Sequence, residues 1–228
     1  MANSNRPYGL SPVKYIGGAD WDGKGNIYYI DSTDGNAYYP GDLMAPHAGL
    51  DASSGLQCVI GATAHGGSYP VAVGVLIAVG ATTPASTTAS QRGGPFIDPT
   101  NLTLTNAPAT KLTNYFALVV DDPNVVFSIR ESASGTHLTK TATSNNADIV
   151  VAAPATGVKV SGSYLDNGAT TSPGTGSGTA TYNFRMMGLT QIIDPGSGLY
   201  NAYGLSAQWN VLINNHAYRA LGVVNYGV

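Results

Sequence analysis

Apolar residues in this chain gather in short runs that are separated by glycine, proline, asparagine and aspartate. The strongest run, residues 69–79, is almost entirely apolar, which is typical of a strand buried on both faces. Shorter runs rich in β-branched and aromatic residues predict strands at 27–30, 37–39, 56–60, 115–120, 148–152, 158–163, 179–187, 188–193 and 208–214. About eight to eleven short strands at this spacing favour an all-β chain, either a β-sandwich or a jelly-roll-like barrel with long loops.

The centre of the chain has the most regular pattern. Residues 124–130 alternate, which places Val126, Ser128 and Arg130 on a solvated face and the intervening residues on a buried face. The preceding Asp-Asp-Pro-Asn at 121–124 has proline and asparagine in favoured turn positions. This pattern predicts a hairpin between the alternating strand and the strand before it.

The strand pattern divides the chain into an arm and one domain. Residues 1–25 contain Pro7, Pro12 and apolar side chains without a regular period, so we expect an extended N-terminal arm that lies on its own domain or on a neighbour. Residues 26–228 are expected to form a single β-rich domain. Within it, residues 80–114 are rich in threonine, alanine, proline and asparagine and predict a long surface excursion.

Composition narrows the classes of function. Charged residues are 10% of the chain, against about 25% in typical soluble domains, and such a neutral surface favours contact with other proteins. A net charge of −3 without runs of like charge argues against nucleic-acid and membrane binding. The opening residues lack the apolar core of a secretory signal, and the one cysteine, Cys58, has no intrachain partner. We therefore expect synthesis in a reducing cytoplasm.

Candidate catalytic and metal-binding residues do not converge in the sequence. Cys58 lies in an apolar run and is expected to be buried. A calcium-type spacing places carboxylates at Asp20, Asp22 and Asp31, but Lys24 stands where an oxygen ligand belongs, which favours an ordinary turn. We expect no catalytic residue, no metal and no cofactor, and a β-sandwich enzyme is the least favoured class. The histidines are widely spaced, at His47, His65, His137 and His216.

Several stretches resemble a known group of proteins. The opening Asn-Arg-Pro-Tyr-Gly-Leu-Ser-Pro-Val at 5–13 is similar to the N-R-P-x-G-L-x-P-V opening of a group of tailed-bacteriophage structural proteins, where it leads into an extended arm. Further similarity lies in Asp-Asp-Pro-Asn-Val-Val-Phe at 121–127, Asn-Asn-Ala-Asp at 145–148 and Trp-Asn-Val-Leu-Ile-Asn-Asn-His at 209–216. The chain thus resembles phage head accessory proteins, also called capsid cement or decoration proteins. It departs from them at 128–131, where Ser-Ile-Arg-Glu has a single acidic residue.

This resemblance implies a non-enzymatic virion structural protein that binds the outer surface of a phage capsid. The expected partners are the major capsid protein and further copies of the chain, with a trimer favoured over a dimer. The expected location is the capsid exterior, after synthesis in the host cytoplasm. The alternative is a tail or fibre-associated virion protein that binds host glycans. The capsid- or neighbour-binding residues are expected in the arm, at Arg6, Pro7, Tyr8, Leu10, Val13, Tyr15 and Trp21.

Overall fold

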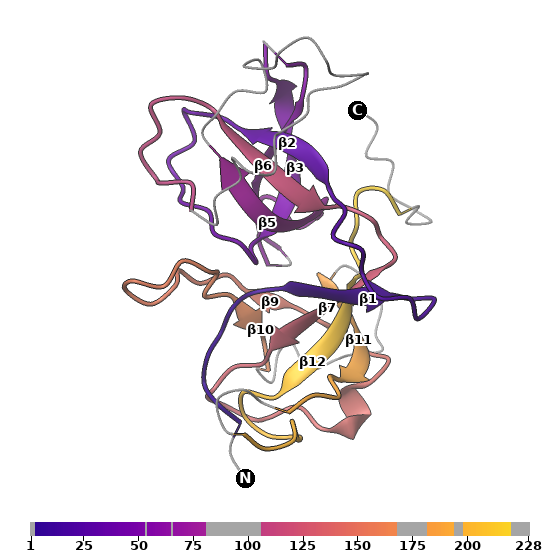
Figure 1. The fold of residues 1–228 in the computed structure, drawn as a ribbon. Coiled ribbons are helices and arrows are strands. Elements are labelled where there is room, and N and C mark those ends of the chain that lie inside the picture. Colours follow the sequence, from indigo (N-terminus) through magenta and orange to yellow (C-terminus); the bar gives the residue numbers. More distant parts are fainter. Residues whose placement is uncertain are drawn as a thin grey trace.

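The computed structural model describes residues 3–52, 54–64, 66–80, 106–167, 182–193 and 198–219. This part of the chain is all-β, as the sequence predicts, apart from the short 3-10 helix η3 (Lys140–Ala142). Figure 1 shows the strands in two bodies, a barrel above and an open sheet below. The strands are β1 (Ser11–Tyr15), β2 (Asn26–Ile30), β3 (Leu43–Leu50), β4 (Gln57–Gly61), β5 (Gly74–Gly80), β6 (Tyr115–Val120), β7 (Val125–Arg130), β8 (Asn146–Ala147), β9 (Ile149–Val150), β10 (Tyr164–Leu165), β11 (Phe184–Leu189) and β12 (Gln208–Ile213).

The upper body is a closed barrel with the strand order β2-β4-β3-β5-β6. Neighbouring strands are antiparallel except for β2 and β4, which run in parallel through the pair Tyr29 and Cys58. The interior is filled by apolar side chains such as Met44, Leu76 and Val119. Because the barrel closes, its strands leave no free sheet edge.

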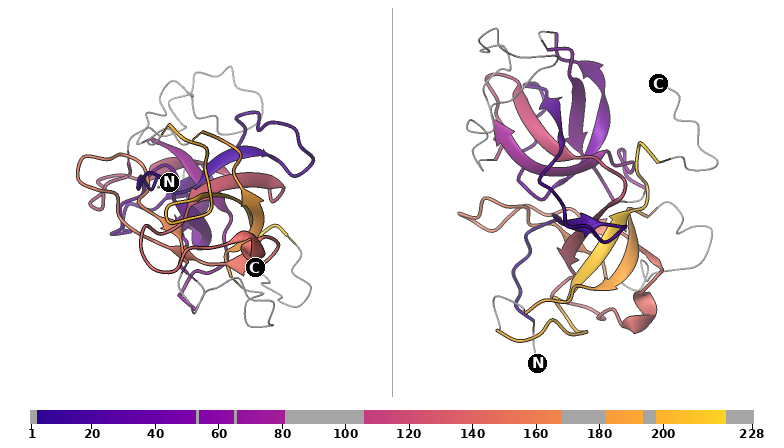
Figure 2. Two further views of the ribbon diagram at one scale, coloured as in Figure 1. Left: turned by 90° about the horizontal axis from the view of Figure 1, so that it is seen from below. Right: turned by 45° about the vertical axis from the view of Figure 1, so that its right-hand side comes forward.

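The lower body is a five-stranded sheet of order β1-β7-β12-β11-β8, with the small sheet β10-β9 beside it. Strand β1 pairs with β7, from Ser11 opposite Ser128 to Tyr15 opposite Val125, and β7 pairs on its other side with β12. In the views of Figures 1 and 2, β1 lies along the side of the sheet that faces the barrel. The sheet therefore forms only when the N-terminal part of the chain meets its C-terminal half.

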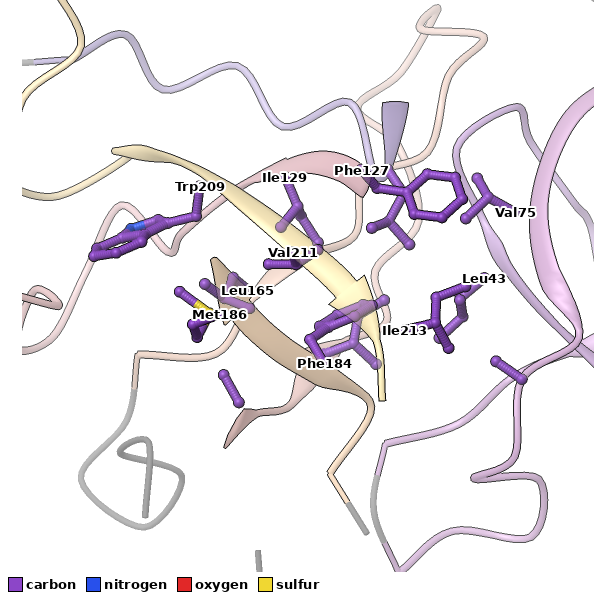
Figure 3. Close-up of a cluster of buried hydrophobic side chains, with 14 of the residues drawn as sticks. Leu43, Val75, Phe127, Ile129, Leu165, Phe184, Met186, Trp209, Val211 and Ile213 are labelled. Atoms are coloured by element: carbon purple, nitrogen blue, oxygen red, sulfur yellow. The ribbon is translucent and has the colours of Figure 1, made fainter. Parts of the chain in front are cut away.

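One apolar core joins the two bodies. Most of it belongs to the sheet, where Phe127 and Trp209 are fully buried. Leu43 and Val75 of the barrel belong to the same cluster, and Figure 3 shows them on the side of Phe127 and Ile213. The barrel and the sheet thus bury apolar surface against each other, which contributes about 25 cal/mol per Å² removed from water.

Two predictions for the centre of the chain are wrong because of this topology. The turn at 121–124 forms, with the Asn124 amide donating to Asp122 Oδ1 at 2.8 Å, but it connects β6 of the barrel to β7 of the sheet. It is therefore not a hairpin turn. All six residues of β7 are buried, Arg130 included, because residues 4–8 lie against the face that carries Ser128 and Arg130. Local turn chemistry and alternation do not report which sheet a strand joins.

Other predicted elements differ in detail. Of the predicted excursion at 80–114, the structure describes Gly80, which ends β5, and residues 106–114, where Ala107 and Lys111 are buried and Leu112 is exposed. The predicted strand at 37–39 contributes one isolated bridge, between Tyr38 and Ala107. Residues 158–163 form no strand, whereas β1 and β3 form without having been predicted.

Candidate functional site

The predicted N-terminal arm lies along the open sheet and forms part of it. Its residues 11–15 are the edge strand β1, hydrogen-bonded to β7. Leu10 has 2% of its surface exposed and belongs to the shared core, so it is not available to a partner. Backbone pairing and core burial thus cross the predicted boundary between an arm at 1–25 and a domain from residue 26.

The remaining predicted arm residues differ in how free their side chains are. The Tyr15 hydroxyl donates to Asp22 Oδ1 at 2.8 Å, and Trp21 Nε1 donates to the Lys24 carbonyl oxygen at 3.1 Å. These two aromatic side chains support the loop between β1 and β2. Tyr8 is half-buried. The exposed side chains are those of Arg6, Pro7 and Val13.

Arg130 holds the N-terminal segment, residues 3–10, onto the sheet. Its Nη1 donates to the carbonyl oxygens of Ser4 at 2.9 Å and Ser206 at 3.1 Å. The guanidinium carbon also lies 5.7 Å from the centre of the Tyr8 ring, which places a cation over an aromatic face. The Tyr8 hydroxyl lies 3.2 Å from Ser128 Oγ. Sequence analysis missed this role because the partners are mainly backbone oxygens far away along the chain.

The N-terminal segment meets the barrel at a contact that requires glycine. Gly9 and Gly41 have φ angles of 69° and 96°, and a Cβ on Gly9 would lie 2.4 Å from the Gly41 carbonyl oxygen. The Leu10 amide donates to that oxygen at 2.9 Å. Close by, the Ser161 amide donates to the Pro40 carbonyl oxygen at 2.8 Å. The N-terminal segment, the barrel and the connection from β9 to β10 are thus fixed against one another.

A groove of 670 Å³ runs between the N-terminal segment and the connection from β9 to β10. We call this connection, residues 151–163, the projecting segment, because it extends away from both bodies in Figures 1 and 2. It exposes the apolar side chains of Val151, Val158 and Val160. Its tip is ordered by the Val158 amide, which donates to the Ala155 carbonyl oxygen at 2.9 Å. Apolar surface on a fixed backbone is typical of protein-binding surfaces.

A second hollow, the rim pocket, has a volume of 710 Å³ and lies at one end of the barrel. Since β4 runs parallel to β2 and β6 runs antiparallel to it, the starts of β2 and β4 meet the end of β6 there. This topology brings together Asn26, Gln57 and Asp121. Tyr218, from the segment after β12, lines another side of the pocket. No spacing in the sequence connects these four residues.

The carboxylate of Asp121 organises the rim pocket. It accepts hydrogen bonds from Asn26 Nδ2, at 3.0 and 2.9 Å to its two oxygens, and from the Tyr28 hydroxyl at 2.5 Å. The hydroxyl oxygens of Tyr28 and Tyr218 are 2.9 Å apart. Burial and the hydrogen bond to Asp121 raise the pKa of Tyr28 far above its usual value. The Tyr28 hydroxyl therefore stays protonated and keeps its donor role throughout the physiological pH range.

Glu131 and His216 are two of the other buried groups whose pKa values are shifted, and neither lines the groove or the rim pocket. Burial raises the pKa of Glu131 to about 7, and its Oε2 accepts a hydrogen bond from Trp209 Nε1 at 2.9 Å. Burial lowers the pKa of His216 to about 4, so this side chain is neutral at pH 7. The His216 Nδ1 accepts the Tyr218 amide at 3.1 Å. Both groups serve internal contacts.

The carboxylates of the calcium-type spacing, Asp20, Asp22 and Asp31, do not form a common site. Asp22 Oδ2 pairs with Lys24 Nζ at 2.6 Å, and Asp31 accepts hydrogen bonds within its own turn. Across the described ranges, no group of three or more histidine, cysteine, aspartate or glutamate side chains is arranged to hold a metal ion. Cys58 is buried, which confirms the prediction for its thiol, while His65 lies outside the described residues.

No family model, no curated protein and no solved structure matches this chain. Within the part of the chain that the structure describes, no helix is long and apolar enough to cross a membrane. A functional proposal therefore rests on the fold, on the groove and rim pocket, and on the sequence resemblance described above.

Proposed function

We propose that this chain is a non-enzymatic virion structural protein that binds the outer surface of a phage capsid and stabilises contacts between major capsid protein subunits. The resemblance to head accessory proteins supports this role, and so does the low content of charged residues, 10%. The structural observation that supports it best is the apolar groove between the N-terminal segment and the projecting segment.

The projecting segment has the chemistry of a protein contact. Lys159 is the single charged residue in the segment, beside the exposed Val151, Val158 and Val160. Val151, Val158 and Val160 have 57%, 40% and 38% of their surface exposed, so covering this remainder contributes about 2 kcal/mol in total before the costs of association. Because its backbone is already ordered by internal hydrogen bonds, the segment loses little conformational freedom on binding.

Repetition of the contact on the capsid strengthens this modest interaction. A shell presents the same surface many times around its symmetry axes, so an oligomer of the chain engages several subunits at once. We therefore propose a homo-oligomer, with a trimer favoured over a dimer, and the major capsid protein as its partner.

Strand addition to β1 is not the favoured mode of contact. The outer edge of β1 is occupied by its own chain, because the Trp21 amide donates to the Val13 carbonyl oxygen at 3.3 Å and the Tyr15 amide donates to the Ala19 carbonyl oxygen at 2.8 Å. A partner therefore meets the exposed side chains of Arg6 and Pro7, which line the groove beside the projecting segment, and that of Val13 on β1. The proposed capsid contact therefore uses side chains rather than backbone.

Co-sedimentation of the purified chain with expanded capsids that lack it tests the proposal. The wild-type chain is expected to pellet saturably at a fixed ratio to capsid subunits. The double variant Val158→Asp, Val160→Asp is expected to lose most of this binding, because each charge would have to be desolvated at the interface. Leu112→Asp is the matched control, since Leu112 is 95% exposed in the loop before β6.

Circular dichroism establishes that the variants remain folded, which is expected because both valines are exposed. A folded wild-type chain that does not pellet would refute the capsid role. Equal pelleting of the double variant and the wild type would show that the projecting segment is not the contact.

A further inference from the structure

The rim pocket is separate from the proposed capsid groove and differs from it in chemistry. Its volume of 710 Å³ falls within the range of about 300–1,000 Å³ that is usual for small-molecule sites. Tyr218 contributes a ring in a side chain that is 51% exposed. Around it lie the polar side chains of Asn26 and Gln57 and the adjacent carboxylates of Asp121 and Asp122. An aromatic side chain thus stands beside several planar polar groups.

Hydrogen bonds hold these groups in place. Asn26 and Tyr28 both donate to the Asp121 carboxylate, which has 9% of its surface exposed. The chain of contacts continues from Tyr28 to the Tyr218 hydroxyl and from there to Gln57 Oε1 at 3.5 Å. A wall that is already ordered loses little freedom when a ligand binds.

The charge of the pocket selects the kind of ligand. Within the described ranges, Asp121 has no lysine or arginine ion-pair partner. The nearby His216 is neutral at pH 7, and the guanidinium of Arg219 donates to the backbone carbonyl oxygens of Ile213 and Pro123. No lysine or arginine of the described residues lines the pocket, so its two carboxylates repel phosphate and carboxylate ligands. They accept hydrogen bonds from a ligand rich in donors.

We propose that the rim pocket binds a neutral saccharide. Hydroxyl groups of the sugar donate to the Asp121 and Asp122 carboxylates, and the Gln57 amide nitrogen donates to a ring or hydroxyl oxygen. The apolar C–H face of the sugar packs on the Tyr218 ring, as apolar groups pack on aromatic faces. The capsid role neither requires nor excludes this activity, which would allow a particle-bound protein to hold a surface glycan.

Binding of full-length ¹⁵N-labelled protein to defined sugars tests the proposal. An array of bacterial surface glycans is screened first, and free glucose, galactose and N-acetylglucosamine are titrated by NMR. At least one sugar is expected to bind and to shift the backbone amides of Asn26, Gln57 and Tyr218. Tyr218→Ala is expected to weaken this binding about tenfold through loss of the stacking surface. Tyr218→Phe keeps the ring and is expected to retain most of the affinity.

The matched control is Tyr200→Ala, because Tyr200 is also strongly exposed and does not line the pocket. This variant is expected to bind the sugar like the wild type. Two results with sugars would overturn the proposal: no binding to the array or to any free sugar at about 10 mM, or unchanged affinity in Tyr218→Ala. The cation n-butylammonium tests whether the carboxylates bind a positively charged ligand instead. Shifts of the same amides by n-butylammonium but by no sugar would also overturn the proposal. Capsid pelleting of Tyr218→Ala, expected to be unchanged, separates failure of this proposal from failure of the capsid role.

Discussion

The barrel and the open sheet differ in which parts of the chain supply their strands and in whether they have free edges. The barrel is made from one continuous part of the chain, β2 to β6, and its closure leaves no free edge. The sheet combines β1, near the N-terminus, with β7, β8, β11 and β12 from the second half of the chain. It ends at two short edge strands, β1 and β8, and so depends on pairing between distant segments.

This difference shows which part of the molecule relies on the N-terminal segment. Strand β1 covers the edge of β7, and the buried Arg130 binds the Ser4 carbonyl oxygen and the Tyr8 ring. The barrel touches the same segment mainly through the contact of Gly9 and Leu10 with Gly41. Changes at the N-terminus should therefore weaken the sheet more than the barrel.

Deletion of residues 1–20 is expected to have the largest effect. It removes β1 and the buried Leu10 and leaves one side of β7 unpaired, which costs about 5 kcal/mol in lost burial and hydrogen bonding. Hydrogen exchange followed by mass spectrometry should show faster exchange in β7 and β12 while β2 to β6 stay protected.

Deletion of residues 1–5 is the matched control for this truncation. It removes the Ser4 carbonyl oxygen that Arg130 binds but keeps Leu10 and β1. Its effect on exchange in β7 should therefore be clearly smaller. Equal protection of β7 in the two truncated proteins would contradict the role assigned to β1.

Phe127→Ala tests whether the two bodies are energetically coupled. Phe127 is fully buried in the cluster that also contains Leu43 and Val75 of the barrel, so its truncation is expected to cost about 4 kcal/mol. Calorimetry should show a single transition at a lower midpoint, since both bodies lose the shared core together. Leu76→Ala is the control for truncation of a buried side chain outside the shared core, because Leu76 belongs to the separate barrel cluster. Two independent transitions in the wild-type protein would argue against coupling.

Glu131→Gln is expected to have a smaller effect, which depends on pH. Burial raises the pKa of Glu131 from 4.5 to about 7 in the folded state. The contribution of Glu131 to the free energy of unfolding is therefore largest below about pH 4.5. It falls as the pH rises towards 7 and the buried carboxyl ionises. The glutamine variant should equal the wild type near pH 4 and exceed it by about 3 kcal/mol at pH 8.

Urea unfolding at several pH values measures this difference. The wild-type protein, measured at the same pH values, is the reference. A glutamine variant whose stability follows the wild-type pH profile unchanged would show that Glu131 does not titrate in this range.

Local features of the sequence predicted much of the secondary structure. Strands β2, β4, β6, β7 and β12 lie within one or two residues of their predicted ranges, because short β-rich runs between turn residues are strong local signals. Strand β3 was missed because it contains Pro46 and Gly49, which disfavour a strand in isolation. Strand β1 was interpreted as an arm because Pro12 and the flanking glycines hid its pairing with β7.

The candidate sites could be predicted less well from the sequence than the strands. Of the predicted arm residues, Leu10 belongs to the core, and Tyr15 and Trp21 are bonded within their own loop. Arg6 and Val13 remain exposed next to the groove or on the edge strand. The rim pocket was not predicted, because its residues come together only when the barrel closes.

The sequence by itself determined the all-β class, the positions of most strands, the buried thiol of Cys58 and a surface poor in charge. These properties follow from local propensity, turn chemistry and composition. The tertiary structure alone decided which strands close the barrel and which form the sheet, and so placed Asn26 beside Asp121 and Arg130 beside Ser4. The physical reason is that strand pairing is non-local: each backbone edge can accept many partners, and only burial of the whole core selects among them.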